Sequence, residues 1–153
     1  MSEDQFGFIL SHRVMQHESD EQVAVPVVED LAARYPAIAS ISFDKGFHSQ
    51  ANQQQLAELV DFPVLPKKGK RSKAEQEREH SARFQRLRRR HSAVESAINA
   101  LEAHGLDRCP DHGIEGFKRY VALAVVARNL HRLGAVLLAR EAEQDKRRRK
   151  RAA

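Results

Sequence analysis

The chain has 153 residues, of which 41% are hydrophobic and 31% charged, a composition that fits one ordinary globular domain. No uninterrupted apolar run approaches the roughly 18–20 residues that cross a bilayer, and no signal peptide is visible at the N-terminus. The single cysteine, Cys109, excludes an internal disulfide and fits a reducing compartment. We therefore expect a cytoplasmic protein without a membrane segment.

The net charge of +5 hides an asymmetry between the two halves of the chain. Residues 1–66 hold 3 Lys and Arg against 10 Asp and Glu, a net charge of −7. Residues 67–153 hold 23 against 11, a net charge of +12. Such a basic half indicates a polyanionic partner, although a well-solvated helical surface would give the same counts.

The first half predicts strands that alternate with helices. Apolar runs at 6–10 (continuing to 14–15), 38–43 and 62–66 are typical of short strands. A helix is expected from near Pro26 to Pro36, with a second over 50–60 that Ser49 caps. The order is β-α-β-α-β, for which parallel strands with right-handed helical crossovers are expected.

The second half predicts two long helices. Ser72 and Glu75 form an S-x-x-E capping box that opens the first, and Gly105 ends it. Its apolar stripe comprises Phe84, Leu87, His91, Val94, Ile98 and Leu101. The second helix is expected over 117–143 with a buried middle at 120–127. We thus expect one domain over 1–140, with its sheet portion at 6–66 and its helical portion at 72–140. The basic tail, 141–153, is expected to be disordered.

Two carboxylates are candidates for chemistry. Asp44 follows the strand at 38–43, where open α/β sheets place ligands, although aspartate at a strand end is often only a turn residue. Glu95 lies mid-helix beside the apolar stripe, where a carboxylate is costly unless it is paired or binds a metal. An ion pair with the run Arg88 to Arg90 would explain Glu95 equally well.

Together these residues suggest phosphodiester chemistry. Carboxylates that hold two divalent ions can activate water and stabilise the attacking and leaving oxygens of a phosphodiester. Mg²⁺, or Mn²⁺ in its place, suits such hard oxygen ligands. Cations that could contact DNA phosphates are Lys67, Lys68, Lys70, Arg71, Arg88, Arg89 and Arg90.

Several segments carry a family resemblance. They are residues 42–49 with Asn52, 88–98, 105–109 and 119–130, and the pair D-K-G-F-x-S and V-E-x-x-I is fairly specific in this order. The chain resembles the C-terminal half of a bacterial insertion-sequence DDE transposase. That resemblance implies an RNase H-like α/β fold, here partial, followed by two long C-terminal helices. It also implies metal-dependent DNA cleavage and strand transfer, with element ends and target DNA as partners and a possible homo-oligomer.

The resemblance assigns Asp44 as the second catalytic aspartate and Glu95 as the final glutamate, both of which would hold the divalent ion. The family's first aspartate lies on an earlier strand, and neither Asp4 nor Asp20 fits that place. We therefore expect an N-terminally truncated transposase that is inactive alone, because residues that act as a unit fail when one is removed.

Other interpretations stay open. The chain could be a non-catalytic basic DNA-binding module in which Asp44 and Glu95 are remnants, or a pseudogene product without a folded function. A zinc site at His104, Cys109 and His112 lacks both a standard spacing and a fourth ligand.

Overall fold

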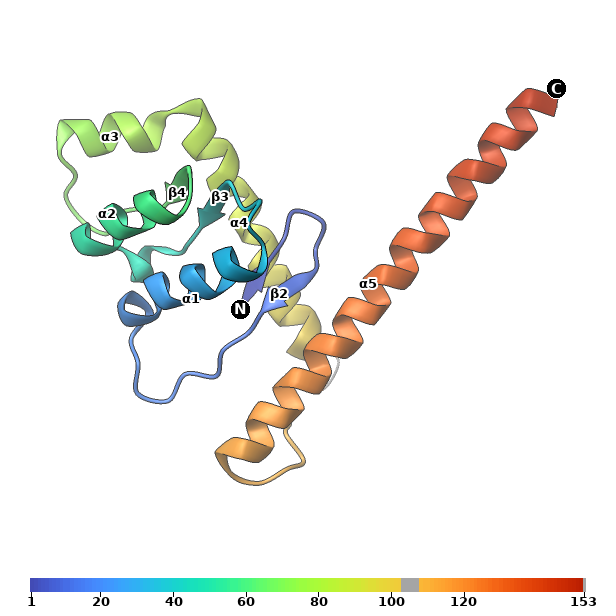
Figure 1. Cartoon of the computed structure of the whole chain (residues 1–153), viewed down its shortest axis with the longest axis horizontal. Coiled ribbons are helices and arrows are strands. Elements are labelled where there is room, and N and C mark those ends of the chain that lie inside the picture. The colour runs from blue at the N-terminus through green and yellow to red at the C-terminus, as the bar shows by residue number, and fades with distance from the viewer. Residues whose placement is uncertain (103–107, 153) are drawn as a thin grey trace. The chain divides into compact units, whose positions relative to one another are not determined.

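A computed structural model describes residues 1–102 and 108–152, without the side chains of 91–98, 100 and 152. The chain divides into two compact units, one of Arg13–Glu95 and one of Met1–His12 with Ser96–Ala153. Figure 1 shows the elements of both. The predicted helix stop at Gly105 lies outside the described residues.

The unit Arg13–Glu95 is built on two parallel strands, β3 (Ser40–Ser42) and β4 (Phe62–Val64). Ser40 is opposite Phe62, and the backbone N–H of Phe43 extends the pairing by donating to Val64 O at 2.9 Å. A short 3₁₀ helix, η1 (Lys45–Phe47), and α2 (Gln50–Leu59) connect the strands. This β-α-β unit confirms the predicted parallel pair and its helical crossover.

Helix α1 (Asp20–Arg34) begins six residues before the predicted start at Pro26. Ser19 and Gln22 form a capping box there, and Pro26 lies inside the helix. Proline cannot donate a backbone hydrogen bond, but the capped first turns hold the helix without it. The predicted end is confirmed, because the helix ends at Arg34 and its C-cap residue, Tyr35, directly precedes Pro36.

The core of this unit lies between α1, α2 and the strand ends. Its buried side chains are Ala24, Val28, Phe43, Leu56, Val60 and Leu65. Figure 1 shows α1 and α2 beside β3 and β4. Ser49 caps α2 as predicted, its Oγ accepting the Asn52 N–H at 3.1 Å. Of the side chains that the apolar spacing of the two helices predicts to face inward, Val28, Leu56 and Val60 lie in this core, whereas Tyr35 is 39% exposed.

The expected long helix from Ser72 is two helices, α3 (Lys73–His80) and α4 (Ala82–Leu101). The capping box of Ser72 and Glu75 is present as predicted. Ser81 breaks the helix, because its Oγ donates to Arg78 O at 2.8 Å and accepts the Phe84 N–H at 3.3 Å. A serine that bonds the backbone on both sides ends one helix and caps the next.

In the other unit, β1 (Ser2–Glu3) and β2 (Ile9–Ser11) form an antiparallel hairpin, so the strand predicted from residue 6 is present but begins only at Ile9. Asp4 Oδ1 accepts the N–H groups of Phe6 and Phe8, and Gly7 has a φ of 83°. This aspartate turn with a left-handed glycine turns the chain where an extended strand was expected. The first strand thus pairs antiparallel with β1, and the predicted series of three parallel strands is wrong at that element.

Helix α5 (Gly113–Ala152) is longer than predicted at both ends. It starts before residue 117, and residues 141–152, where we expected a disordered tail, continue it as helix. Residue 153 lies outside the described part. The predicted buried middle at 120–127 is wrong: Val125 is buried with Ile9 and Leu101, whereas Leu123 is 68% and Val126 55% exposed.

Asn129 of α5 holds the hairpin through its amide. Its Oδ1 accepts the Ile9 N–H and its Nδ2 donates to Ile9 O, both at 2.9 Å. Arg132 Nε donates to Phe6 O at 2.6 Å. Figure 1 shows β2 beside α5. Asn129 is thereby explained as a residue that satisfies strand backbone groups.

By length and composition alone, Gly113–Arg151 of α5 could cross a membrane. The criterion is weak evidence for one helix, and this stretch includes Asn129 and Arg132, which bind the hairpin. The expected absence of a membrane segment stays a prediction.

Candidate active site and basic loop

Asp44 lies directly after β3 and Phe43, at the carboxyl end of the parallel pair. It caps η1, and its Oδ1 accepts the Lys45 N–H at 2.7 Å. The residue is exposed. Asp44 therefore forms a turn, as the simpler interpretation of its position predicted. It is also an exposed carboxylate at the sheet edge where α/β folds bind ligands.

The glycine of the D-K-G motif packs against another carboxylate. A Cβ at Gly46 would lie 2.5 Å from Oδ2 of Asp20, the first residue of α1. From the sequence we considered Asp20 only as a candidate for the family's first aspartate, which it does not fit, and we did not predict this contact. No local signal in the sequence pairs positions 20 and 46; the capping motif at Ser19 only places Asp20 at a helix start.

Asn52, which the resemblance included, ties this corner together. Its buried amide Nδ2 donates to Glu21 O at 2.8 Å and to Phe47 O at 3.0 Å. One side chain of α2 therefore fixes the start of α1 and the end of η1. Because Asp44 caps the start of η1, these bonds also limit where the Asp44 backbone can move.

Glu95 lies in α4, but its side chain is outside the part that the structure describes. The convergence of its carboxylate with Asp44 therefore stays a prediction. Arg88, Arg89 and Arg90 precede it in the same helix, with Arg88 half-buried and the other two exposed. Their contact with DNA likewise stays a prediction.

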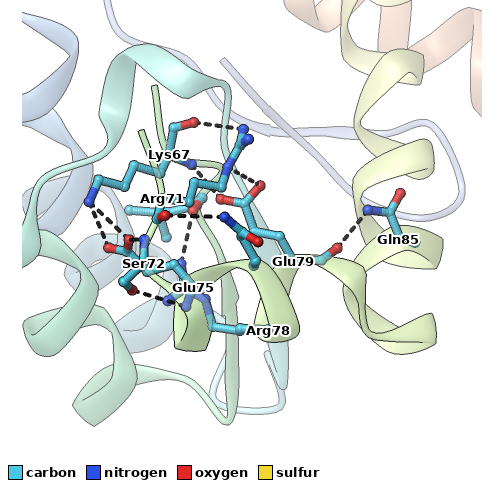
Figure 2. A network of polar contacts seen from close by, with 9 residues as sticks. Lys67, Arg71, Ser72, Glu75, Arg78, Glu79 and Gln85 are labelled. Carbon is cyan, nitrogen blue, oxygen red and sulfur yellow. Dashed lines mark hydrogen bonds and ion pairs between the residues drawn. The ribbon is translucent and has the colours of Figure 1, made fainter. Parts of the chain in front are cut away.

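The basic loop, residues 67–71, is closed by two acidic residues of α3. Lys67 Nζ lies 2.8 Å from Oε1 of Glu75, and Arg71 Nε lies 3.0 Å from Oε2 of Glu79. Figure 2 shows both contacts as dashed lines, with Lys67 reaching Glu75 and Arg71 reaching Glu79. Of the seven cations that we predicted to bind DNA, four lie in this loop, and two of those four are therefore paired within the chain.

Backbone contacts complete the loop closure. Glu79 Oε1 accepts the Lys67 N–H at 2.8 Å, and Arg71 Nη2 donates to Lys67 O at 3.0 Å (Figure 2). Glu79 is buried, and a buried carboxylate is costly unless it has partners. The contacts with Arg71 and the Lys67 N–H stabilise its charge. Sequence reasoning assigned Glu79 no role, since nothing in its spacing marks it as the anchor of a loop.

The other two loop cations, Lys68 and Lys70, have different surroundings from Lys67 and Arg71. Lys68 and Lys70 are exposed, and Gly69 between them has a φ of 85°. A Cβ at Gly69 would meet nothing within 4 Å, so this tip is open. Over the described residues, no ion pair involves Lys68 or Lys70, which leaves both ammonium groups available to an anion.

The described residues fit a divalent ion only in part. Asp44 supplies the hard oxygen that Mg²⁺ prefers. Within residues 1–102 and 108–152, however, no group of three or more His, Cys, Asp or Glu could hold a metal. Cys109 donates to Asp111 O at 3.6 Å, and the His104 of the weighed zinc site lies outside the described residues.

Comparison with known families decides the relationship. Residues 2–130 match the family described as Transposase DDE domain. The chain belongs to this family. No curated protein and no solved structure matches it.

Membership in the Transposase DDE domain family gives the chain a role in DNA transposition, with DNA as its partner. DDE transposases generally depend on a divalent metal ion. The mixed helices and small sheets are consistent with the predicted α/β class, and the family implies the RNase H-like fold. Asp44 and Glu95 both lie inside the matched residues.

Proposed function

We propose that this chain supplies two ligands, Asp44 and Glu95, of the divalent-metal site with which a DDE transposase cleaves DNA and transfers the strand. The ion would be Mg²⁺ or Mn²⁺, and the element a bacterial insertion sequence. The observation that carries the proposal is the position of Asp44, an exposed carboxylate at the carboxyl end of β3. The family match and the place of Glu95 on α4 support it.

In this arrangement the protein's own contribution is positional. The Lys45 N–H holds Oδ1 of Asp44 at 2.7 Å and leaves Oδ2 without a hydrogen bond among the described residues. When bound, the divalent ion would polarise the scissile phosphodiester and its attacking oxygen. Asn52 keeps η1, and with it Asp44, against the start of α1.

We further propose that the chain alone cleaves DNA slowly or not at all. The family uses three carboxylates, and no residue here takes the place of its first aspartate. Loss of one member from a set that acts as a unit removes most of the catalytic rate. The chain alone would then act as a DNA-binding part of a larger active assembly.

Iron-directed cleavage of the protein backbone tests the ligand pair. Fe²⁺ with ascorbate and peroxide is expected to cut the chain near residues 44 and 95 if both carboxylates hold one ion. Asp44→Asn and Glu95→Gln should each abolish both cuts and lower Mn²⁺ affinity about tenfold or more. Asp61→Asn, which alters another exposed aspartate of the same unit, should change neither.

Cuts at only one of the two positions, or Mn²⁺ affinity that survives both substitutions, would overturn the proposed ligand pair. This readout does not require turnover. It therefore tests the ligands even where the isolated chain is inactive.

A non-catalytic DNA-binding module is the second candidate, and the exposed lysines of the basic loop favour it. Lys68 and Lys70 flank the open tip at Gly69 while acidic partners occupy Lys67 and Arg71. If DNA binding is indifferent to Mn²⁺ and to both carboxylate substitutions, this function replaces the first. In either case we propose a cytoplasmic location.

A further inference from the structure

Helix α5 carries an exposed apolar stripe, defined here as Leu123, Val126, Leu130, Leu133 and Leu137. All five side chains are between 44% and 68% exposed. They recur at alternating spacings of three and four residues, the pattern that aligns side chains along one seam of a helix pair. A stripe of this kind is uncommon on a monomeric protein and marks an interaction surface.

The stripe is separate from the face that binds the hairpin. Val125 is buried against Ile9, and Asn129 bonds the Ile9 backbone. At about 100° per residue, the middle of the stripe lies roughly 120° around the helix from Val125. The hairpin therefore leaves the stripe without cover.

Charged residues on the same side of α5 indicate what covers it. Arg119 lies four residues before Leu123, and Glu141 four residues after Leu137, so the stripe ends in opposite charges. Two copies of α5 that cross antiparallel about Leu130 would place Leu123 opposite Leu137. The same register places Arg119 of each copy opposite Glu141 of the other.

A parallel pair would have the reverse effect. It would set Arg119 beside Arg119 and Glu141 beside Glu141, and would align the six consecutive basic residues at 146–151 with each other. Like charges at such positions are destabilising. The charge pattern thus selects an antiparallel second copy as the occupant.

We propose that α5 is the interface of a homodimer in which the apolar stripes of two copies pack antiparallel about Leu130. A two-fold axis through Leu130 makes the surface self-complementary, as a closed dimer requires. Arg119 also donates to Asp111 of its own chain at 2.8 Å. Because that pair is exposed, the guanidinium can exchange partners at small cost.

Cysteine cross-linking of the full chain in a Cys109→Ser background tests the orientation. A mixture of Leu123→Cys and Leu137→Cys chains should form disulfide dimers that contain one of each. Leu123→Cys alone should cross-link weakly. Efficient cross-linking of Leu123→Cys with itself would overturn the antiparallel arrangement.

Sedimentation over a range of concentrations tests the interface itself. Leu137→Ser should raise the dissociation constant about tenfold or more, whereas the adjacent Leu138→Ser should leave it nearly unchanged, because Leu138 lies about 100° around the helix from the middle of the stripe. Circular dichroism should show equal helix content in both variants.

Charge reversal gives a second test that keeps the apolar stripe intact. Arg119→Glu and Glu141→Arg should each raise the dissociation constant about tenfold, and the double variant should restore it. A chain that stays monomeric at about 100 µM would overturn the proposal, because its dissociation constant would then be weaker than roughly 10⁻⁴ M. Binding of monomers to anionic vesicles through the stripe would overturn it as well.

Discussion

The buried carboxylate of Glu79 lies 3.0 Å from the guanidinium Nε of Arg71, across the turn that follows β4. The same carboxylate accepts the Lys67 N–H at 2.8 Å. One acidic side chain of α3 therefore holds both ends of the basic loop. This contact turns a run of cations into a loop of defined shape with Lys68 and Lys70 at its tip.

Removing Glu79 should destabilise the fold. Glu79→Ala leaves the Arg71 guanidinium and the Lys67 N–H without their partner, and we expect a loss of about 2 kcal/mol in the free energy of unfolding. Urea denaturation measures this loss. Glu77→Ala, which removes an exposed glutamate from the same helix, should change it by less than about 0.5 kcal/mol. Equal losses for the two variants would contradict a structural role for Glu79.

DNA binding should depend on two of the four loop cations. Each phosphate contact contributes about 0.9 to the slope of log K against log salt concentration. Lys68→Gln with Lys70→Gln should therefore reduce the slope by about 1.8, whereas Lys67→Gln with Arg71→Gln should leave it nearly unchanged. Fluorescence anisotropy with a duplex oligonucleotide at several salt concentrations measures both slopes.

The two double variants each remove two positive charges, so any difference between them reports contacts and not net charge. Lys67→Gln with Arg71→Gln should also lower the unfolding temperature, because Glu75 and Glu79 lose their partners. If the two variants change the slope equally, the ion pairs do not keep Lys67 and Arg71 from DNA.

Stability should fall in acid through Glu75. Hydrogen bonds from Lys67 Nζ and from the Ser72 N–H lower the pKa of the Glu75 carboxyl from 4.5 to about 2. A carboxyl with a lowered folded-state pKa stabilises the fold above its unfolded pKa, and that contribution disappears as the pH falls. The loss should therefore run from about pH 4.5 to about pH 2.

Comparison with Glu75→Gln isolates this effect, because the variant should lack the loss over that range. The variant is needed, since burial raises the pKa of Glu3 and makes a contribution of opposite sign. The hydrogen bond from Arg119 lowers the pKa of Asp111, so Asp111 contributes with the same sign as Glu75. Parallel unfolding curves for wild type and variant across this range would show that the Glu75 contacts do not stabilise the fold.

Local signals in the sequence predicted the elements well where one motif decides the backbone. The S-x-x-E box at Ser72 and the cap at Ser49 both appear as expected. The S-x-x-Q box at Ser19 is the same kind of signal, but Pro26 was given more weight than the cap. Ser81 was missed because serine is common within helices as well as at their ends.

Contacts between distant segments were beyond sequence reasoning. Arg71 and Glu79 lie eight positions apart, and no periodic pattern links a loop to a helix at that distance. The burial of the middle of α5 was predicted wrongly, because apolar residues along a helix indicate that the helix has surface to bury. They do not indicate which partner buries it. The predicted approach of Glu95 to Asp44 would depend on tertiary packing in the same way.

The glycine of the D-K-G motif offers a direct probe of the candidate site. A methyl group at Gly46 would come within 2.5 Å of Asp20 Oδ2, so Gly46→Ala forces the Asp20 side chain or the start of α1 to move. We expect a cost of about 1 kcal/mol in the free energy of unfolding. Asp20→Ala in the same background should recover most of it, because the contact is then gone.

A double-mutant cycle over Gly46→Ala and Asp20→Ala measures that coupling. Additive effects would show that the two positions do not touch. Asn52 should limit how far the start of α1 and η1 can move apart, since its amide donates hydrogen bonds to Glu21 O and Phe47 O on either side of the contact. Gly46→Ala should therefore cost less in an Asn52→Ala background, because the start of α1 is then free to move away from η1 and from Asp44.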